Sequence, residues 1–340
     1  MFFRVMSRCE VIFWDVGQGD ASSICLPDGT YILIDTGPNA KKGNPLPRWF
    51  AEHPDERIRK VVITHNHRDH FGGLSSLLEA GCDIDEVVML SDKACYEMPT
   101  QVDFRLLKSA LESKAKLGKI KLTWLRMSPY ELFKDEHYSL TMVHPEALEI
   151  PSMVDKNYSS MIVRLDSAVR SNAPVIVWGG DALLKDVKRC LAPNRPEILM
   201  GPHHGKPQDG FCSIDTCAKE LGNICPKCLF VSVGTSNAYN HPDRYFLLAA
   251  TELGVRICCS EITERCGKFV RNGVDIYPGN LMLGIRKPPK AIECRGGMRV
   301  FVDDNGNLSF DECQSEFEEA VKRVGNRFCE KRGKVNNRNQ

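Results

Sequence analysis

Long apolar runs and a surplus of charge are both missing from this sequence. No segment approaches the roughly 20 consecutive apolar residues that span a bilayer, so we expect no membrane contact. The first residues, Met1-Phe2-Phe3-Arg4, lack the apolar core and cleavage site of a secretory signal, and we expect no export. The 45 Lys and Arg residues nearly balance the 44 Asp and Glu residues, for a formal net charge of +1. That balance argues against nucleic-acid binding through a global field, but not through a local groove.

Cysteine, in contrast, is abundant, with 15 residues in the chain. An odd number in a chain this long, without an export signal, favours thiols or metal ligands over a disulfide framework. We therefore expect a reducing, cytoplasmic location. Cys225-Pro226-Lys227-Cys228 has CxxC spacing, and together with Cys259 and Cys266 it could form a structural Zn²⁺ site. Buried thiols without a metal are the alternative.

The order of short apolar runs predicts the layers of the fold. A chain of 340 residues with 42% hydrophobic content suits one large domain with an appendage, or two modest domains. Strands are expected first, over residues 9–34, and then strands alternate with helices up to about residue 255. Two mixed sheets packed face to face, with helices outside, would accommodate this order. We place a main domain at residues 1–255, a Cys-containing β extension at 256–310, and an amphipathic helix with a basic tail at 311–340.

Four potential metal ligands fall within six residues in the stretch His65-Asn66-His67-Arg68-Asp69-His70. The apolar run before it predicts a strand, and a helix is expected from about Phe71, so the cluster should lie on a tight strand-to-helix loop. Neutral imidazoles and carboxylates are ligands that Zn²⁺ and similar divalent ions prefer. We expect the first pair of ligands to hold one ion and the last pair to hold a second. A chance cluster of solvated side chains is the alternative.

Further ligands are expected where later strands end. Asp181 follows the apolar run Val177-Trp178-Gly179-Gly180, and it could bridge two cations about 3.5–4 Å apart. A helix cap for residues 182–191 is the competing interpretation. His203 and His204 follow another apolar run, and one of them could complete the second ion. Their adjacency argues against both binding the same ion.

Two more residues have a functional and a structural interpretation. His241 precedes Pro242 at an expected helix start, so it is either a catalytic residue or a capping residue. Asp35 follows an expected strand at residues 31–34. It is either a turn residue or a support that orients the histidine cluster.

The order and spacing of these motifs resemble those of the metallo-β-lactamase superfamily. The matching elements are Ile34-Asp35-Thr36-Gly37, His65-x-His67-x-Asp69-His70, Gly180-Asp181 and His203. More narrowly, the chain resembles the metallo-β-lactamase-like domain of the ComEC competence proteins. That resemblance rests on Asp15-Val16-Gly17-Gln18-Gly19-Asp20-Ala21, His203-His204-Gly205, and Ser232-Val233-Gly234 through Asn237-x-Tyr239-x-His241-Pro242. It covers residues 9–255 and implies class α/β, an αββα sandwich of the metallo-β-lactamase type.

Two departures from the family pattern concern the site. Many members supply a further His between the cluster and the bridging Asp, but residues 157–165 contain none. ComEC-like members share this lack, which implies that water or a weaker oxygen ligand completes the first site; Asn157 is kept as a candidate site residue. Lys206 stands where relatives often have Ser, and a cation there would favour an anionic substrate, with a solvated Lys as the alternative.

Residues and resemblance together predict a metal-dependent hydrolase with two divalent cations, Zn²⁺ favoured over Mn²⁺. His65 and His67 are assigned to the first ion. Asp69, His70 and His203 are assigned to the second, with His204 as a further candidate, and Asp181 is assigned to both. A hydroxide between the ions would attack a phosphorus or carbonyl centre. His241 would stabilise the transition state or protonate the leaving group. The catalytic residues are expected to be Asp69, His241 and Asp35.

The resemblance to ComEC-like nucleases favours a phosphodiester substrate, in nucleic acid or a nucleotide. Hydrolysis of an amide, ester, thioester or lactone is the alternative within enzymes. A non-catalytic protein that binds nucleic acid or a partner is the alternative outside them, and a basic tail is its best support. The tail contains Lys322, Arg323, Arg327, Lys331, Arg332, Lys334 and Arg338. No partner protein is indicated.

Overall fold

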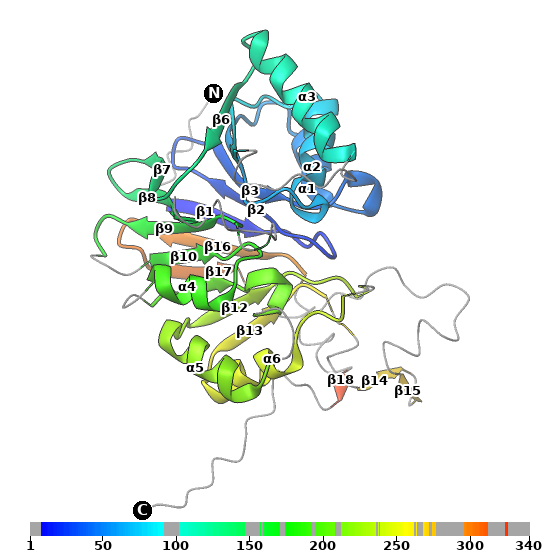
Figure 1. Ribbon diagram of the computed structural model, residues 1–340, viewed down its shortest axis with the longest axis vertical. Coiled ribbons are helices and arrows are strands. Elements are labelled where there is room, and N and C mark those ends of the chain that lie inside the picture. Colours follow the sequence, from blue (N-terminus) through cyan, green and yellow to red (C-terminus); the bar gives the residue numbers. More distant parts are fainter. Residues whose placement is uncertain are drawn as a thin grey trace, which may run out of the picture.

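The structure is a computed structural model of the chain (Figure 1). It describes residues 8–91, 102–146, 157, 159–170, 174–191, 195–207, 212–235, 237, 239–261, 263, 268–271, 274–276, 296–311 and 324–325.

The first sheet has eight strands and combines segments from distant parts of the chain. Its order is β17-β16-β1-β2-β3-β4-β5-β6. The strands from β17 to β3 pair antiparallel, whereas β3 to β6 run parallel. Their bounds are β1 Arg8–Phe13, β2 Ala21–Cys25, β3 Tyr31–Thr36, β4 Ile58–Ile63, β5 Glu86–Leu90, β6 Lys121–Leu125, β16 Met298–Asp303 and β17 Leu308–Asp311.

The second sheet has seven strands in the order β13-β12-β11-β10-β9-β8-β7. The strands from β7 to β10 pair antiparallel, and β10 to β13 run parallel. Their bounds are β7 Tyr130–Lys134, β8 Tyr138–His144, β9 Ile162–Ser167, β10 Pro174–Trp178, β11 Ile198–Met200, β12 Cys228–Val231 and β13 Arg256–Cys259. A small third sheet contains β14 Lys268–Arg271, β15 Val274–Ile276 and β18 Val324–Gly325.

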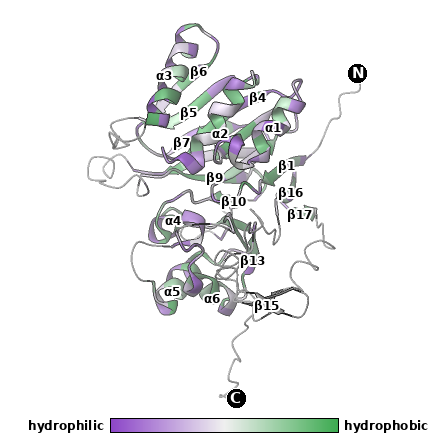
Figure 2. Cartoon of the chain, turned by 90° about the vertical axis from the view of Figure 1, so that its right-hand side faces the viewer, coloured by the Kyte–Doolittle hydropathy of each residue, from purple (hydrophilic) through white to green (hydrophobic). Residues whose placement is uncertain are grey.

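The two large sheets pack against each other, and helices cover both outer faces (Figure 1). Between the sheets, the ring of Phe13 lies 4.9 Å from that of Phe230 and 6.1 Å from that of Trp178, measured between centroids. The helices on the first sheet are α1 Pro45–Glu52, α2 Arg68–Glu79 and α3 Val102–Lys116, and those on the second are α4 Leu184–Leu191, α5 Ile214–Ile224 and α6 Arg244–Glu252. Figure 2 shows hydrophilic and hydrophobic residues alternating along α3 and α5, as expected of helices with one buried face. The prediction of an αββα sandwich is confirmed.

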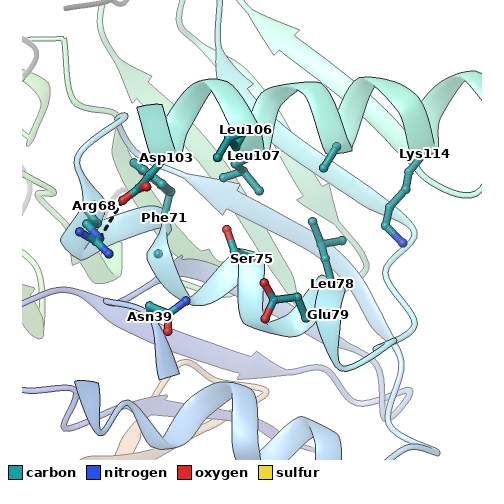
Figure 3. A pocket seen from close by; sticks show the side chains of 12 residues that line it. Asn39, Arg68, Phe71, Ser75, Leu78, Glu79, Asp103, Leu106, Leu107 and Lys114 are labelled. Carbon is teal, nitrogen blue, oxygen red and sulfur yellow. Dashed lines mark ion pairs between the residues drawn. The ribbon is translucent and has the colours of Figure 1, made fainter. Parts of the chain in front are cut away.

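Helix α2 begins at Arg68, earlier than the sequence predicted. His67 has extended backbone angles, and its carbonyl accepts hydrogen bonds from the amides of His70 and Phe71, which closes the first turn. Asp69 and His70 therefore lie on the first helical turn and not in a loop. Arg68 in this turn also forms an ion pair of 3.1 Å with Asp103 of α3, at one end of a cavity of about 450 Å³ between the two helices (Figure 3).

The boundary placed after residue 255 does not coincide with the edge of either sheet. β13 extends the second sheet, and β16 pairs with β1 in the first, so residues 256–259 and 298–311 belong to the sandwich. The edge strand β7 was not predicted; only Leu132 of its residues is buried, and the others are half-buried or exposed. Of the helix predicted over residues 311–331, the structure describes only Asp311 and Val324–Gly325, and it places them in strands. None of the described helices combines the length and apolar character needed to cross a membrane.

Helix α2 lies unusually close to β3 at Gly73, and this contact provides a test of the fold. A Cβ atom built on Gly73 collides with the carbonyl oxygen of Thr36, and the Gly73 amide donates to the carbonyl of Gly37 at 2.9 Å. Gly73→Ala should therefore lower the free energy of unfolding by about 2 kcal/mol or more, because backbone must move to admit the methyl group. Urea unfolding would measure this change. The matched control is Gly222→Ala in α5, where the new methyl group meets only ordinary contacts at 3.6 Å, and there we expect a gain of about 0.5–1 kcal/mol. Equal effects at the two positions would contradict this account of the packing.

Candidate metal centre

The candidate ligands lie where strands of both sheets end. His65 and His67 follow β4, Asp181 follows β10, and His203 and His204 follow β11. Because β10 and β11 are neighbouring parallel strands, their carboxyl ends lie at the same edge of the second sheet. The sandwich thus brings together residues that are more than a hundred positions apart in the sequence.

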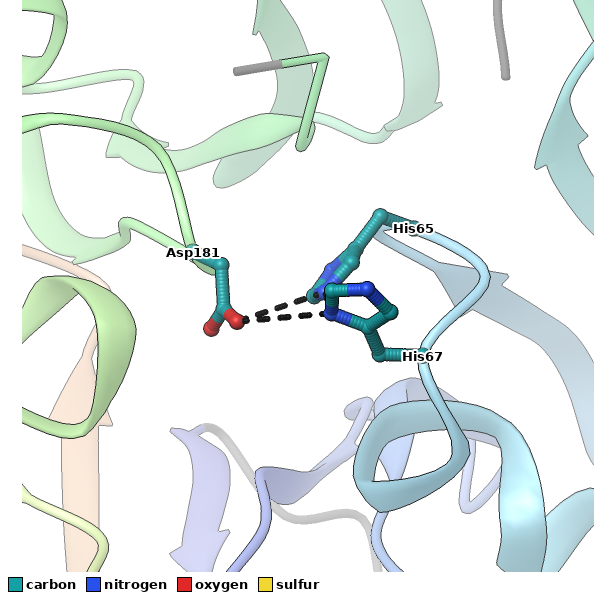
Figure 4. A group of neighbouring side chains, drawn as sticks. All are labelled: His65, His67 and Asp181. Atoms are coloured by element: carbon teal, nitrogen blue, oxygen red, sulfur yellow. Dashed lines mark hydrogen bonds and ion pairs between the residues drawn. The ribbon is translucent and has the colours of Figure 1, made fainter. Parts of the chain in front are cut away.

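His65, His67 and Asp181 form a first group of ligand atoms. His65 Nε2 lies 3.3 Å and His67 Nδ1 lies 3.9 Å from Asp181 Oδ2, and the two nitrogens are 2.9 Å apart. Figure 4 shows both imidazoles pointing at the Asp181 carboxylate from the loop after β4.

Asp69, His70 and His204 form a second group. His204 Nε2 lies 3.3 Å from Asp69 Oδ2, and His70 Nε2 lies 3.2 Å from Asp181 Oδ1. Asp181 Oδ1 is also 3.8 Å from His204 Nε2. The two oxygens of Asp181 therefore face different groups, which is the arrangement expected of a carboxylate that bridges two cations.

These residues fit a pair of divalent cations. Ligand atoms held at about 2.1 Å in tetrahedral geometry lie about 3.4 Å apart, close to the separations found here. His70 Nε2, His204 Nε2 and Asp181 Oδ1 are buried and face ion-pair partners at 3.2 to 3.8 Å, but none of them makes a hydrogen bond of regular geometry to a residue that the structure describes. Buried polar atoms rarely lack a partner, so their convergence at one point favours a bound ion.

A layer of buried acceptors holds two of the imidazoles in place. Asp35 Oδ2 lies 2.8 Å from His70 Nδ1, and the same carboxylate accepts hydrogen bonds from the amide and the hydroxyl of Thr64, each at 2.8 Å. Asp20 Oδ1 lies 3.1 Å from His204 Nδ1. In both imidazoles the contact on Nδ1 directs Nε2 toward Asp181, a common support for metal-binding histidines.

Asp20 and Ser160 also belong to the centre, although neither was among the site residues predicted from the sequence. Asp20 is 2% exposed and directly precedes the buried strand β2, which is a signal that a buried partner exists. Ser160 Oγ lies 3.3 Å from His65 Nδ1 and accepts a hydrogen bond of 2.9 Å from the Asp181 amide. The segment without histidine therefore positions the centre through a hydroxyl group. Asn157, in the same segment, is 8% exposed, and its carbonyl accepts from the Ser160 amide at 3.0 Å.

Burial and neighbouring charges shift the pKa values of the side chains in the centre. Burial, with His70 nearby, lowers the pKa of His65 to about 3, so its imidazole is neutral at neutral pH and able to bind a metal. Burial alone would raise the pKa of Asp181, but His70, His65 and His204 hold it well below the usual range. Burial alone would lower the pKa of His70, but Asp181 and Asp35 raise it well above the usual value. Cations that bind here must displace such protons.

The structure places His204, and not His203, with Asp69 and His70. His203 Nε2 instead lies 3.6 Å from Asp181 Oδ2, the oxygen that faces His65. His241 is 4% exposed, and its ring centroid is 5.2 Å from that of His203 and 5.9 Å from that of His204. Lys206 follows the histidine turn, and its amide donates to the His203 carbonyl at 2.9 Å.

The cysteines predicted to form a zinc site are not gathered into one cluster among the described residues. Cys228 packs between the sheets, with its Sγ 3.6 Å from that of Cys258, whereas Cys259 packs on the outer face with the helices. Cys266 lies outside the described residues, so the third ion stays a prediction. Cys212 and Cys217 form a disulfide, which the cysteine count did not predict.

Comparisons with known proteins agree with this geometry. Residues 14–84, which include Asp20, Asp35 and the histidine cluster, match the family model of the metallo-β-lactamase superfamily. This part of the chain is thus similar to that superfamily. The superfamily is hydrolytic and typically binds divalent metals.

Similar proteins match the chain over different lengths. Hydroxyacylglutathione hydrolase of Pseudomonas savastanoi pv. phaseolicola is 47% identical over 48 residues, which are 14% of this chain and 17% of that protein. ComE operon protein 3 of Bacillus subtilis is 23% identical over 270 residues, 74% of this chain and 32% of that protein. The chain thus matches about a third or less of each relative. Unliganded yeast PDE1 has a TM-score of 0.45 at 14% identity, covering 75% of this chain and 98% of that one.

The contact between Asp35 and His70 provides a test of the metal centre. Asp35→Asn removes the charge that holds His70 Nδ1, and Asn tolerates the left-handed backbone at this position, where φ is 55°. We expect the affinity for one of two bound Zn²⁺ ions to fall about 10- to 100-fold. Competition with a chromophoric chelator would measure both affinities. The control is Asp28→Asn in an exposed turn, which should change neither. Unchanged binding in Asp35→Asn would contradict the assigned role.

Proposed function

We propose that this protein is a dinuclear metal-dependent phosphodiesterase that acts on nucleic acid or on a nucleotide. The observation that carries the proposal is the Asp181 carboxylate, whose two oxygens face two separate groups of ligand atoms. Two divalent cations held there would supply hydroxide at neutral pH and take up negative charge from the reacting centre. The choice of a phosphodiester rests on the resemblance to ComEC-like nucleases and on a cavity beside Asp69.

A large cavity lies beside the metal centre and favours an extended substrate. Its volume is about 1540 Å³, more than the roughly 300–1,000 Å³ of most small-molecule pockets. Asp69 is part of its wall, so the cavity reaches the second group of ligands. Its lining includes three aromatic side chains and three cationic side chains: Trp14, Trp49, Tyr239, Lys41, Arg68 and Arg299. Bases stack on aromatic side chains and phosphates attract cations, so these six side chains suit single-stranded nucleic acid, while Asp15, Asp69 and Glu261 add acidic groups to the same lining.

His241 is the residue best placed to assist the reaction beside the cations. Burial, together with His204 and His203, lowers its pKa to about 3, so the imidazole is neutral at neutral pH. A neutral imidazole retains one N–H group that can donate a hydrogen bond to a developing oxyanion. This favours transition-state stabilisation over protonation of the leaving group, the other role considered for His241.

A proton donor for the leaving group is available elsewhere in the cavity. Burial, with Asp15 beside it, raises the pKa of Glu261 to about 7, although the Thr235 amide opposes this shift. Glu261 lines the same cavity as Asp69. At neutral pH a substantial fraction of Glu261 carries a proton that it can give up.

The similarity to hydroxyacylglutathione hydrolases supports a second candidate, hydrolysis of an acyl compound. The match to these hydrolases has a higher sequence identity than the match to ComE operon protein 3, but it covers far fewer residues. Both reactions use hydroxide against an electrophilic centre, so the substrate alone distinguishes them.

Metal-loaded protein should cleave phosphodiesters. The purified protein, supplied with Zn²⁺ or Mn²⁺, would be incubated with bis-p-nitrophenyl phosphate, a single-stranded oligonucleotide and a hydroxyacylglutathione. We expect turnover of the first two, falling at least 100-fold in a His67→Ala, Asp69→Ala double variant. His137→Ala, in the turn before β8, is the control and should retain full activity. Cleavage of the hydroxyacylglutathione alone would establish the acyl candidate, and tight oligonucleotide binding without cleavage would establish the non-catalytic alternative.

Tyr239 tests whether the cavity binds bases. This residue is 68% exposed, and its ring stacks on that of His241 with an interplanar angle of 20° and centroids 5.9 Å apart. Tyr239→Ala should raise the KM for a single-stranded oligonucleotide about tenfold or more, since stacking contributes about 1–3 kcal/mol per base. Tyr239→Phe keeps the ring and should leave the KM within about twofold. Equal effects of the two variants would argue against stacking.

A further inference from the structure

We infer that His203 and His204, although adjacent in sequence, bind different cations, and that His203 completes the ligand set of the first. The inference rests on the two-cation centre proposed above and deepens it. It assigns His203 to the His65 and His67 group, the opposite of its assignment from the sequence.

The two groups of ligand atoms are unequal without His203. The second group offers four ligands, namely Asp69, His70, His204 and one oxygen of Asp181. The first group offers three, namely His65, His67 and the other oxygen of Asp181. Zn²⁺ in proteins is usually four-coordinate, so the first group lacks one ligand.

His203 faces the group that is incomplete. Its Nε2 lies 3.6 Å from Asp181 Oδ2, a separation between those of His65 Nε2, at 3.3 Å, and His67 Nδ1, at 3.9 Å, from the same oxygen. The His204 ring instead approaches Asp181 Oδ1. The two rings have centroids 6.2 Å apart and planes at 62°, so they reach the carboxylate from different directions.

The backbone explains how adjacent residues can diverge in this way. His203 and His204 both have left-handed backbone angles, with φ of 50° and 53° and ψ of 49° and 35°. Residues other than glycine rarely have such backbone angles. They keep them where the surrounding structure enforces them, often at functional sites. The turn is enforced here, because the His203 amide donates to the Gly180 carbonyl at 2.8 Å and Gly205 packs tightly against Pro242. The hydrogen bond to Gly180 also ties the turn to the residue before Asp181.

The segment that could otherwise supply the missing ligand is already engaged. Ser160 Oγ contacts His65 Nδ1 and accepts a hydrogen bond from the Asp181 amide. This hydroxyl group therefore orients two members of the first group from behind. His203 is left as the remaining imidazole within 4 Å of Asp181 Oδ2 among the residues that the structure describes.

Metal stoichiometry and affinity test the inference without reference to activity. Metal-free protein would be titrated with Zn²⁺ and with Mn²⁺, and bound metal would be measured after equilibrium dialysis. The key variant is His203→Gly, because glycine accepts the left-handed backbone and preserves the turn. We expect the wild type to bind two ions and His203→Gly to bind one of them more than about 100-fold more weakly. Added imidazole should restore the lost ion.

Double variants identify which ion is lost. Adding His67→Ala to His203→Gly should leave one ion bound, since both changes affect the first group, whereas adding His204→Gly should abolish binding of both. Asn240→Gly is the matched control, since Asn240 also has a left-handed backbone, with φ of 59°, and should change neither affinity.

Three results would overturn the inference. They are two ions bound with unchanged affinity in His203→Gly, loss of the same ion in His203→Gly and His204→Gly, and a single bound ion in the wild type. Two ions that follow the expected pattern in a protein without phosphodiesterase activity would overturn the proposed function and leave this inference standing.

Discussion

The carboxylate of Asp181 carries a negative charge at a place that water hardly reaches. It is 2% exposed, and a charge so deeply buried is tolerated only when positive or hydrogen-bonding groups surround it. Imidazoles from the loop after β4, the first turn of α2 and the turn after β11 provide these groups, divided between its two oxygens. The loops after β4, β10 and β11 are thus coupled through one residue. A displacement of any of them changes the surroundings of the others.

The sandwich makes this coupling possible by keeping the supports rigid. Asp35 and Thr64 lie at the ends of the neighbouring parallel strands β3 and β4, and their hydrogen bonds link these strands directly behind His70. Asp20 ties the segment before β2 to His204 of the opposite sheet. The first sheet therefore helps to orient an imidazole of each sheet, and the centre depends on the packing of one sheet on the other.

The sequence was informative wherever the signal was local. The spacing of His65, His67, Asp69 and His70 identified the cluster, because ligand types and strand-to-helix context lie within a few residues. Alternating apolar runs likewise predicted most strands of both sheets. The different positions of His203 and His204 around Asp181 were not predictable. They depend on two consecutive residues with left-handed backbone angles, which residues other than glycine seldom adopt. The membership of β16 in the first sheet was hidden too, since its partner β1 lies at the other end of the described chain.

The pairing of β1 with β16 has a consequence for how the molecule assembles. Cys9 of β1 lies opposite Val302 of β16. The first described strand can therefore complete its pairing only after almost the whole described chain has been synthesised. Contacts between such distant positions are slow to form, because a long stretch of chain must be closed before any bonding is gained. During synthesis one edge of β1 stays open after β2 has paired with the other, and an open edge can recruit foreign strands. Arg8 and Glu10 in β1 place charges along that edge, which discourages such association before β16 emerges.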